Sequence, residues 1–208
     1  LSHGAASARR EGLLTMKFVT PPIDDVLVVA ATAAEAAHVP DGTDLLICGI
    51  GKVRSATALT RRLTPDPQRY RRVVNIGTAG ALHLHHGGLF VPSSVIEHDI
   101  SAAEITALGY PTRDTWEIDG GDGTTLATGD TFVNDEATRD LLAQRADLVD
   151  MEAAALAHVC GEFGIPFRAV KVVSDYADDS AMDWPAAIDA AARDLGGWLT
   201  YTRFGALD

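Results

Sequence analysis

The stretch GIPFRAVKVVSDYADD, residues 164–179, places a helix end, a buried strand and a carboxylate in immediate succession. Gly164 and Pro166 follow an Ala-rich segment and predict where a helix stops. Residues 167–173 form an apolar run of strand length that ends in Ser174-Asp175. A carboxylate directly after a buried strand predicts that this end of the strand opens onto a cleft.

The same order of strand and helix recurs on both sides of this stretch. Further strands are predicted at residues 26–31, 45–48, 73–76 and 89–96, and helices at residues 52–64, 135–146, 151–163 and 184–204. Residues 99–123 are expected to be irregular. The alternation predicts an α/β fold with a mixed, mostly parallel central sheet flanked by helices. A single domain is expected over residues 16–208, after a tag or mobile tail at residues 1–15.

Composition narrows the classes of partner. The 208 residues are 47% hydrophobic and carry a net charge of −12, so a nucleic-acid partner, which requires a basic face, is not expected. No apolar run approaches the roughly 20 residues of a membrane span. Cys48 and Cys160 both lie in apolar stretches and are expected to be buried thiols, which favours the reducing cytoplasm.

Small or polar residues follow several of the predicted strands. Glu35 comes shortly after the first strand, Gly49 and Gly51 after the second, Thr78 after the third, and Asp175 after the strand at 167–173. In parallel α/β sheets, ligands bind beyond the carboxyl ends of the strands. These residues are therefore expected to surround a common crevice.

Two motifs that suggest other chemistry are incomplete. GIGK at 49–52 lacks the third glycine of a dinucleotide loop and the spacing of a phosphate loop, so it predicts either a tight turn or a close backbone approach to a ligand. HLHH at 83–86 lacks the companion ligands of a structural zinc site and is expected to be a solvent-exposed loop. No metal and no cofactor are predicted.

The acidic residues also have plain structural explanations. Asp150 and Glu152 stand where a helix begins, and acids there stabilise the helix through its dipole and free amides. Asp175 could in the same way cap the segment that follows it. The residues alone leave these alternatives open.

Six stretches, taken in order, carry a family resemblance: GIGKV (49–53), NIGTAGAL (75–82), EITALGY (104–110), GDTFVND (129–135), VDMEAAALAHVCGEFGIPF (149–167) and VVSDYAD (172–178). Together they resemble the nucleoside phosphorylase and nucleosidase superfamily, most closely its methylthioadenosine/S-adenosylhomocysteine nucleosidase branch. The resemblance implies a three-layer fold and hydrolysis of the N-glycosidic bond of a 5′-substituted adenosine, as in methionine salvage. It also implies a homodimer that acts on a small nucleoside without a cofactor.

The resemblance assigns the catalytic roles to three acids. Asp175 would protonate N7 of the departing purine, and Ser174 would orient it. Glu152 would bind the ribose hydroxyls, and Glu35 would activate the attacking water. An oxocarbenium-like sugar and a protonated leaving group require acids of this kind, as in glycoside hydrolysis.

Four further positions would bind the substrate. The resemblance implies that Met151 packs against the sugar, that Phe132 stacks on the purine, and that the backbone of Val133 bonds to the purine edge. Thr78 replaces the more usual serine and keeps a hydroxyl near the water.

Other functions remain open at this point. A phosphorylase needs cationic anchors for phosphate; hexameric phosphorylases have an arginine where this chain has Asn75, although Arg54 remains a possible anchor. Relatives that act on 6-oxopurines, including futalosine hydrolases, tend to have asparagine at the position of Asp175. A nucleoside-binding module without catalysis is the non-enzymatic alternative. Only nine residues, HVPDGTDLL, stand where the family has a β-hairpin, so a strand pair is expected to be missing or truncated.

Overall fold

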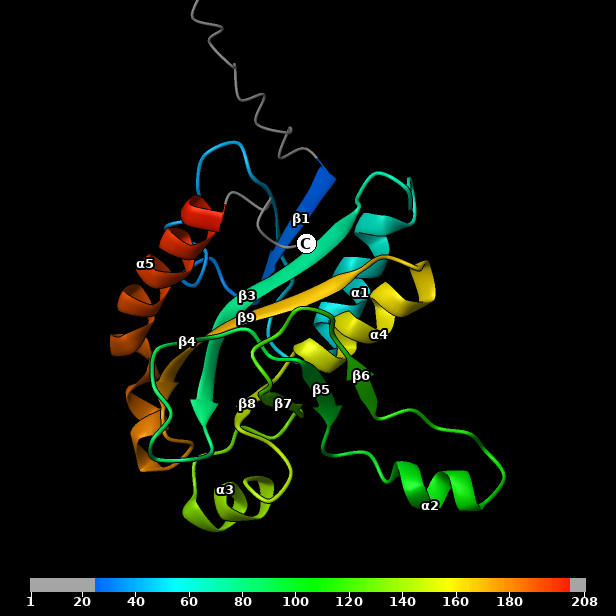
Figure 1. Ribbon diagram of the computed structural model, residues 1–208, viewed down its shortest axis with the longest axis vertical. Coiled ribbons are helices and arrows are strands. Elements are labelled where there is room, and N and C mark those ends of the chain that lie inside the picture. The colour runs from blue at the N-terminus through cyan, green and yellow to red at the C-terminus, as the bar shows by residue number, and fades with distance from the viewer. Residues whose placement is uncertain (1–24, 203–208) are drawn as a thin grey trace, which may run out of the picture.

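The computed structural model describes residues 25–202, apart from the side chains of residues 180, 183, 185, 186 and 202. The predicted tail at residues 1–15 lies outside the described residues. The strands are β1 (Val26–Ala30), β2 (Asp44–Ile47), β3 (Arg72–Ala81), β4 (Leu89–Phe90), β5 (Ser94–Glu97), β6 (Thr115–Glu117), β7 (Thr125–Thr128), β8 (Leu148–Asp150) and β9 (Phe167–Asp175). The α-helices are α1 (Lys52–Leu63), α2 (Ala102–Ala107), α3 (Glu136–Leu142), α4 (Ala153–Phe163) and α5 (Trp184–Thr202) (Figure 1).

The strands of the described chain form one sheet that branches at β3. Its main path runs β2-β1-β3-β8-β7-β5-β6, and β9 pairs with both β3 and β4. The pairs of β1 with β2, β1 with β3, β3 with β9, β5 with β7 and β7 with β8 are parallel, while β3 and β8 are antiparallel. The predicted mixed, mostly parallel sheet is therefore confirmed.

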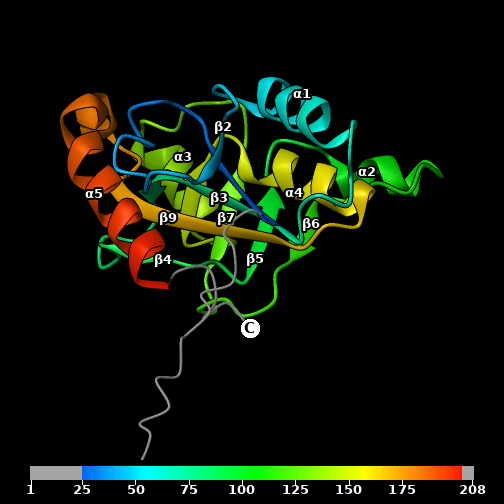
Figure 2. The ribbon, with the colours of Figure 1, turned by 90° about the horizontal axis from the view of Figure 1, so that it is seen from above.

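Helices cover both faces of this sheet because the central strands are apolar on both sides. In β1, Val28 faces a core that contains Leu195 of α5, whereas the alternate residues Leu27 and Val29 face a core that contains Leu156 of α4. Each such fully buried side chain stabilises the fold by about 1.5–3 kcal/mol. Figure 2 shows α5 at one side of the sheet and α1 with α4 at the other, which gives three layers.

Several predicted boundaries were wrong. The third strand continues to Ala81, so Thr78 lies within β3 and not beyond its end. The run at 89–96 forms two strands, because Pro92 has no N–H to donate to a ladder. The region 99–123 contains α2 and β6 and is not wholly irregular. The strands β7 and β8, of four and three residues, are too short to show a period and were not predicted.

Residues 31–43 contain no strand, as the short spacing before GIGK predicts, and β2 forms one edge of the sheet. Cys48 and Cys160 are buried and unpaired with each other. Burial raises the pKa of each to about 12, so both remain thiols near neutral pH. None of the described helices combines the length and apolar character needed to span a bilayer.

Candidate active site

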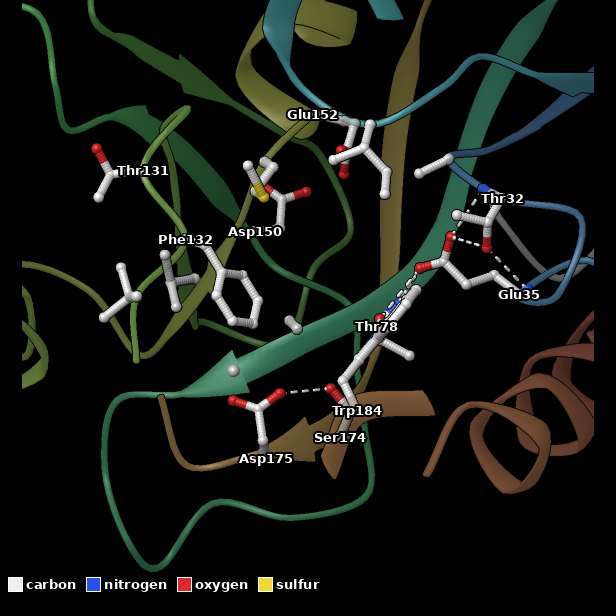
Figure 3. Close-up of a pocket in the computed structure, with 17 residues that line it drawn as sticks. Thr32, Glu35, Thr78, Thr131, Phe132, Asp150, Glu152, Ser174, Asp175 and Trp184 are labelled. Carbon is white, nitrogen blue, oxygen red and sulfur yellow. Dashed lines mark hydrogen bonds between the residues drawn. The ribbon is translucent and has the colours of Figure 1, made fainter. Parts of the chain in front are cut away.

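A cavity of about 330 Å³ lies where β1, β3, β8 and β9 end or bend. Figure 3 shows Glu35, Glu152 and Asp175 arranged around it. All eight predicted site residues line it: Glu35, Thr78, Phe132, Val133, Met151, Glu152, Ser174 and Asp175. The structure thus brings together residues from five distant parts of the chain, while the role of each remains a prediction.

Glu35 is held by a reciprocal pair of contacts with Thr32. The Thr32 N–H and hydroxyl each donate to Oε2 of Glu35 at 3.0 Å, and the Glu35 N–H donates to the Thr32 hydroxyl at 3.2 Å. This is the pattern of a capping box, here closing the turn after β1. It fixes the carboxylate at the wall of the cavity, where 5% of Glu35 is exposed.

The other oxygen of Glu35 faces β3. The Thr78 N–H and hydroxyl donate to Oε1 at 2.9 and 3.1 Å, and the Trp184 indole N–H donates to the Thr78 hydroxyl at 2.8 Å. Because the indole occupies one acceptor position of the hydroxyl, the hydroxyl proton is directed at Glu35. A chain of hydrogen bonds therefore runs from α5 through β3 to the carboxylate (Figure 3).

Glu152 lies across the cavity and is bound by the GIGK turn. Gly51 has a φ of 92°, which glycine adopts without strain, and its N–H donates to Oε1 of Glu152 at 2.9 Å. The turn thus binds a carboxylate of its own chain. Burial, then the charge of nearby Asp150, raises the pKa of Glu152 to about 7, although Lys171 and the Gly51 N–H oppose this.

A buried ion pair lies next to these acids. Lys171 of β9 is 1% exposed, and its Nζ lies 2.9 Å from Oδ2 of Asp150. Burial opposes the charged form of Lys171, but the neighbouring carboxylates outweigh it and raise the pKa of the lysine. Asp150 also accepts from the Thr128 hydroxyl at 2.6 Å and from the N–H of Ala153, the first residue of α4, at 3.1 Å. The structural alternative therefore describes Asp150 but not Glu152, which occupies the N-cap position of α4 without a side-chain capping bond.

Asp175 is positioned by an irregularity at the end of β9. Ala79 pairs with Val173 but Gly80 pairs with Asp175, so Ser174 is an extra residue in the ladder. Such a bulge redirects the side chains around it. The Ser174 hydroxyl donates to Oδ2 of Asp175 at 2.7 Å, and the Ala177 N–H donates to Oδ1 at 2.9 Å. Asp175 therefore caps the following turn, as the structural alternative predicts, and also lines the cavity.

The strand β3 sets the distance between two of the acids. A Cβ added to Gly77 would lie 2.9 Å from Oε1 of Glu35, and one added to Gly80 would lie 3.0 Å from Oδ1 of Asp175. Three residues of strand span roughly 10 Å. The cavity is thus long enough to hold a base beside Asp175 and a sugar beside Glu35.

The predicted binding residues occupy the remaining walls. Phe132 and Val133 lie on the segment between β7 and α3, and Met151 lies between β8 and α4. Val133 is 6% exposed, whereas Phe132 is 47% exposed and forms a rim. Figure 3 shows the Phe132 ring between the side of the cavity with Thr131 and the side with Asp175.

Sequence reasoning missed three residues of this network. Thr32 could have been found from the T-x-x-E spacing to Glu35. Lys171 could have been found as a charge inside an apolar strand, since such a residue must be paired when buried. Trp184 contacts Thr78 across 106 residues of sequence, and no local pattern indicates this.

The HLHH loop was predicted to be solvent-exposed, and this was wrong for His83 and His86, which are both partly buried. The side chain of His86 is 14% exposed, and its Nε2 lies 3.2 Å from Oδ1 of Asp147. The loop following β3 folds back to the start of β8, because the Leu82 N–H donates to the Asp147 carbonyl. His85 is exposed as expected.

Comparison with known proteins gives concordant matches. The model of the Phosphorylase superfamily matches residues 122–199. The chain is 34% identical over 184 residues to the 5′-methylthioadenosine/S-adenosylhomocysteine nucleosidase of Geobacillus kaustophilus, covering 74% of this chain and 76% of the relative. It is 33% identical over 168 residues to the enzyme of the same name from Bacillus subtilis, covering 66% of this chain and 70% of the relative.

Solved structures show the same fold. A variant of Helicobacter pylori MTAN with 5′-methylthioadenosine in its active site superposes with a TM-score of 0.74 at 20% identity, covering 88% of this chain and 99% of that one. The futalosine hydrolase of the same organism superposes with a TM-score of 0.71 at 21% identity, covering 86% and 96%. At these identities the likeness concerns the fold alone.

Proposed function

Because the chain belongs to the methylthioadenosine/S-adenosylhomocysteine nucleosidase family, we propose that it hydrolyses the N-glycosidic bond of a 5′-substituted adenosine and releases adenine. The observation that carries this proposal is the meeting of Glu35, Glu152 and Asp175 around one cavity. A site that only bound a nucleoside would not require three carboxyl groups there.

Asp175 is the proposed general acid. A purine is a poor leaving group as an anion, so N7 must receive a proton as the bond breaks. In its protonated form Asp175 can donate that proton, and the Ser174 hydroxyl and Ala177 N–H hold its carboxyl group in a fixed plane. Proton transfer by a positioned acid contributes roughly 10²–10⁴-fold to a rate.

Glu152 is the proposed group that stabilises the sugar. As the base departs, the ribose acquires oxocarbenium character, and a nearby carboxylate that accepts from the ribose hydroxyls stabilises this positive charge. The Gly51 N–H occupies Oε1 of Glu152, so Oε2 is the oxygen that would face the sugar. Met151 would pack against the other side of the ribose.

Glu35 and Thr78 are proposed to hold the attacking water. Their contacts with Thr32 and Trp184 fix both groups before substrate arrives. Water then needs no further reorganisation of the protein to reach the anomeric carbon, and such preorganisation is a major source of rate enhancement. The Glu35 carboxylate would take the proton that the water loses.

Phe132 and Val133 are proposed to hold the purine, by stacking and by backbone hydrogen bonds. An aspartic acid at position 175 favours adenine, because its second oxygen can accept from the exocyclic amine while the first donates to N7. The futalosine-type substrates remain a second candidate, since a futalosine hydrolase shares the fold at a similar TM-score. Turnover of methylthioadenosine, S-adenosylhomocysteine, aminodeoxyfutalosine and futalosine, compared at equal concentration, identifies the substrate.

Water is favoured over phosphate as the nucleophile. No arginine or lysine is among the described residues that line the cavity. The Asn75 amide is buried and donates to the Val29 carbonyl, and Arg54 packs near Gly49 outside the cavity lining. Phosphate would therefore enter the cavity without a cationic anchor.

The proposed assembly is a cytoplasmic homodimer. Ile50 and Phe132 line the cavity and are each 47% exposed, and nearby Val53 is 76% exposed. Apolar side chains at the rim of a cavity favour cover by a second copy of the chain. The buried thiols Cys48 and Cys160 favour a reducing compartment. Light scattering should give the mass of two chains, and the mass of one chain at all concentrations would contradict the dimer.

The reaction is tested by adenine release from methylthioadenosine with and without phosphate. Release without phosphate is expected, whereas release only with phosphate indicates a phosphorylase and binding without release indicates a binding module. Asp175→Asn should lower kcat by about 10²–10⁴-fold and keep the fold, because asparagine can still accept from the Ala177 N–H. Asp179→Asn, at an exposed neighbour, is the matched control and should retain activity.

The role of Glu35 is tested separately. Glu35→Gln should keep nucleoside binding but lose hydrolysis by about 10²-fold or more, because the amide cannot take a proton from water. Glu162→Gln changes an exposed glutamate of α4 in the same way and should have no effect. An active Glu35→Gln variant would show that another group handles the water.

A further inference from the structure

The loop between β3 and β4, outside the proposed active site, brings the imidazole rings of His83 and His86 close together. After β3, the segment 82–88 leads to β4 (Figure 1) and contains HLHH at 83–86. The His86 N–H donates to the His83 carbonyl at 3.0 Å, and this turn brings the two ring centroids to 5.3 Å. The His86 ring also packs edge-on against Phe90, with centroids 5.1 Å apart.

A carboxylate from another element completes the group. Asp147 directly precedes β8, and its Oδ1 lies 3.2 Å from Nε2 of His86. The Thr125 N–H donates to the other oxygen, Oδ2, at 2.8 Å. Backbone bonds from the Asp147 N–H to the Thr125 carbonyl and from the Leu82 N–H to the Asp147 carbonyl tie all three segments together. The bonds to Thr125 and Leu82 therefore fix the backbone and Oδ2 of Asp147, while Oδ1 lies next to His86.

The donor atoms are close enough to share one ion. One ligand atom each from His83, His86 and Asp147 lies within 4.8 Å of the other two, and all three residues are partly buried. In a tetrahedral zinc site with bonds of about 2.0–2.2 Å, ligand atoms lie about 3.4 Å apart. Small rotations of the histidine side chains close the difference, while the backbone bonds keep the loop in place.

We propose that His83, His86 and Asp147 bind one divalent transition-metal ion, with zinc as the preferred ion. Two imidazoles and one carboxylate suit zinc and its neighbours and do not suit magnesium or calcium, which prefer oxygen ligands. Three protein ligands leave a fourth position for water. None of the three residues lines the cavity with Glu35, Glu152 and Asp175, so the ion is a structural clamp between the β3–β4 loop and the start of β8.

A second histidine–aspartate pair, His38 with Asp189, shows how the proposed metal site differs from an ordinary ion pair. Nε2 of His38 lies 3.1 Å from Oδ1 of Asp189, nearly the same distance as in the His86–Asp147 pair. His38 and Asp189 are more exposed and have no third ligand among the described residues. If proximity of one histidine and one aspartate were enough, both pairs would bind metal; the proposal requires His83 as well.

The test is metal binding by the full chain after treatment with a chelator. Titration calorimetry with zinc chloride should show one saturable site per chain. His83→Gln and His86→Gln should each weaken binding by at least about tenfold, because each removes one of three ligands. His38→Gln should leave the affinity unchanged. Zinc should also raise the Tm of the wild type, and raise it less in the two ligand variants.

His83 and His86 lie in a loop, so their substitution should not unfold the protein. Circular dichroism of each variant checks that the secondary structure is kept. Absence of saturable zinc binding in the wild type overturns the proposal. So does binding that survives in both ligand variants, since it would then arise elsewhere, for instance at His3. An equal loss in His85→Gln would overturn the assigned ligand set. No substrate enters these measurements, so their outcome is independent of the proposed nucleosidase activity.

Discussion

Glu152 lies between a buried lysine, a buried aspartate and the amide of a glycine turn. Its carboxyl group is removed from water, which disfavours the charged form, and Asp150 adds repulsion. Lys171 and the Gly51 N–H act in the opposite direction but do not cancel these effects, so the pKa reaches about 7. The free protein therefore holds Glu152 in both protonation states near neutral pH, whereas the proposed role requires the carboxylate.

This predicts a pH dependence of activity. A pKa of about 7 means that Glu152 is mostly protonated one pH unit lower and mostly ionised one unit higher. The kcat/KM should therefore rise about tenfold between roughly pH 6 and 8, since kcat/KM reports groups of the free enzyme. The measurement is the initial rate of adenine release at low substrate concentration across this range.

The residual activity of Glu152→Gln provides the control for this dependence. It should not show the rise, because glutamine does not titrate. A wild-type profile that is flat across this range, or a rise that persists in Glu152→Gln, would assign the dependence to another group. Because Glu152 interacts with Asp150 and Lys171, the pH midpoint of the activity profile reports the titration of these three residues together.

At the scale of elements, β3 is the strand against which two of the acids rest. The carboxylate of Glu35 packs against Gly77 of β3, and that of Asp175 packs against Gly80, next to the bulge in β9. A side chain at either glycine would occupy space that a carboxylate now fills. The glycines of NIGTAGAL are thus explained by close approach of the acids and not by backbone conformation, since neither has a positive φ.

Gly77→Ala should therefore lower activity without unfolding the protein. The new Cβ would lie 2.9 Å from Oε1 of Glu35 and 3.3 Å from Nζ of Lys171, so the carboxylate must move. A displacement of this kind is expected to lower kcat/KM by roughly 10–100-fold. Steady-state kinetics on adenine release measure the effect.

Gly161→Ala is the matched control for that substitution. Gly161 lies in α4, and a Cβ there meets nothing within 4 Å. Alanine should leave activity unchanged and stabilise the helix by up to about 1 kcal/mol. Equal activity of the two alanine variants would mean that Glu35 does not need its observed position.

At the scale of the whole molecule, the stability of the fold depends on charge balance inside the sheet. Asp150 is 6% exposed, and Glu35 and Glu152 are buried nearby, while Lys171 provides the positive charge among them. Removing one partner of a buried pair leaves the other charge uncompensated, which costs about 3–5 kcal/mol. This cost should appear in global unfolding because Lys171 lies in β9, next to the central strand β3.

Lys171→Met should accordingly lower the free energy of unfolding by about 3–5 kcal/mol, measured by urea denaturation. Arg193→Met is the control, since Arg193 pairs with Asp189 on the exposed face of α5 and its loss should cost about 1 kcal/mol or less. Adding Asp150→Asn to Lys171→Met should recover part of the loss. An equal decrease in the free energy of unfolding in the two single variants would show that the buried Lys171–Asp150 pair matters no more to stability than a surface pair.

The elements that sequence predicted best were those with strong local patterns. The strand at β1, the helix α4 with its stop at Gly164, and the polar end of β9 were all predicted from apolar runs, glycine and proline. The short strands β7 and β8 were missed, because a strand of three or four residues has too few positions to show a period. They form only through the ladders that neighbouring strands supply.

The sequence by itself determined the α/β alternation and the acids that follow its strands, since these depend on neighbouring residues and on ordered motifs. Tertiary structure alone decided that Trp184 directs the hydroxyl of Thr78, that Lys171 lies among the acids, and that His83 and His86 meet Asp147. Such contacts join residues far apart in the chain, and the protonation of Glu152 depends on burial and charges that exist only once the sheet has assembled.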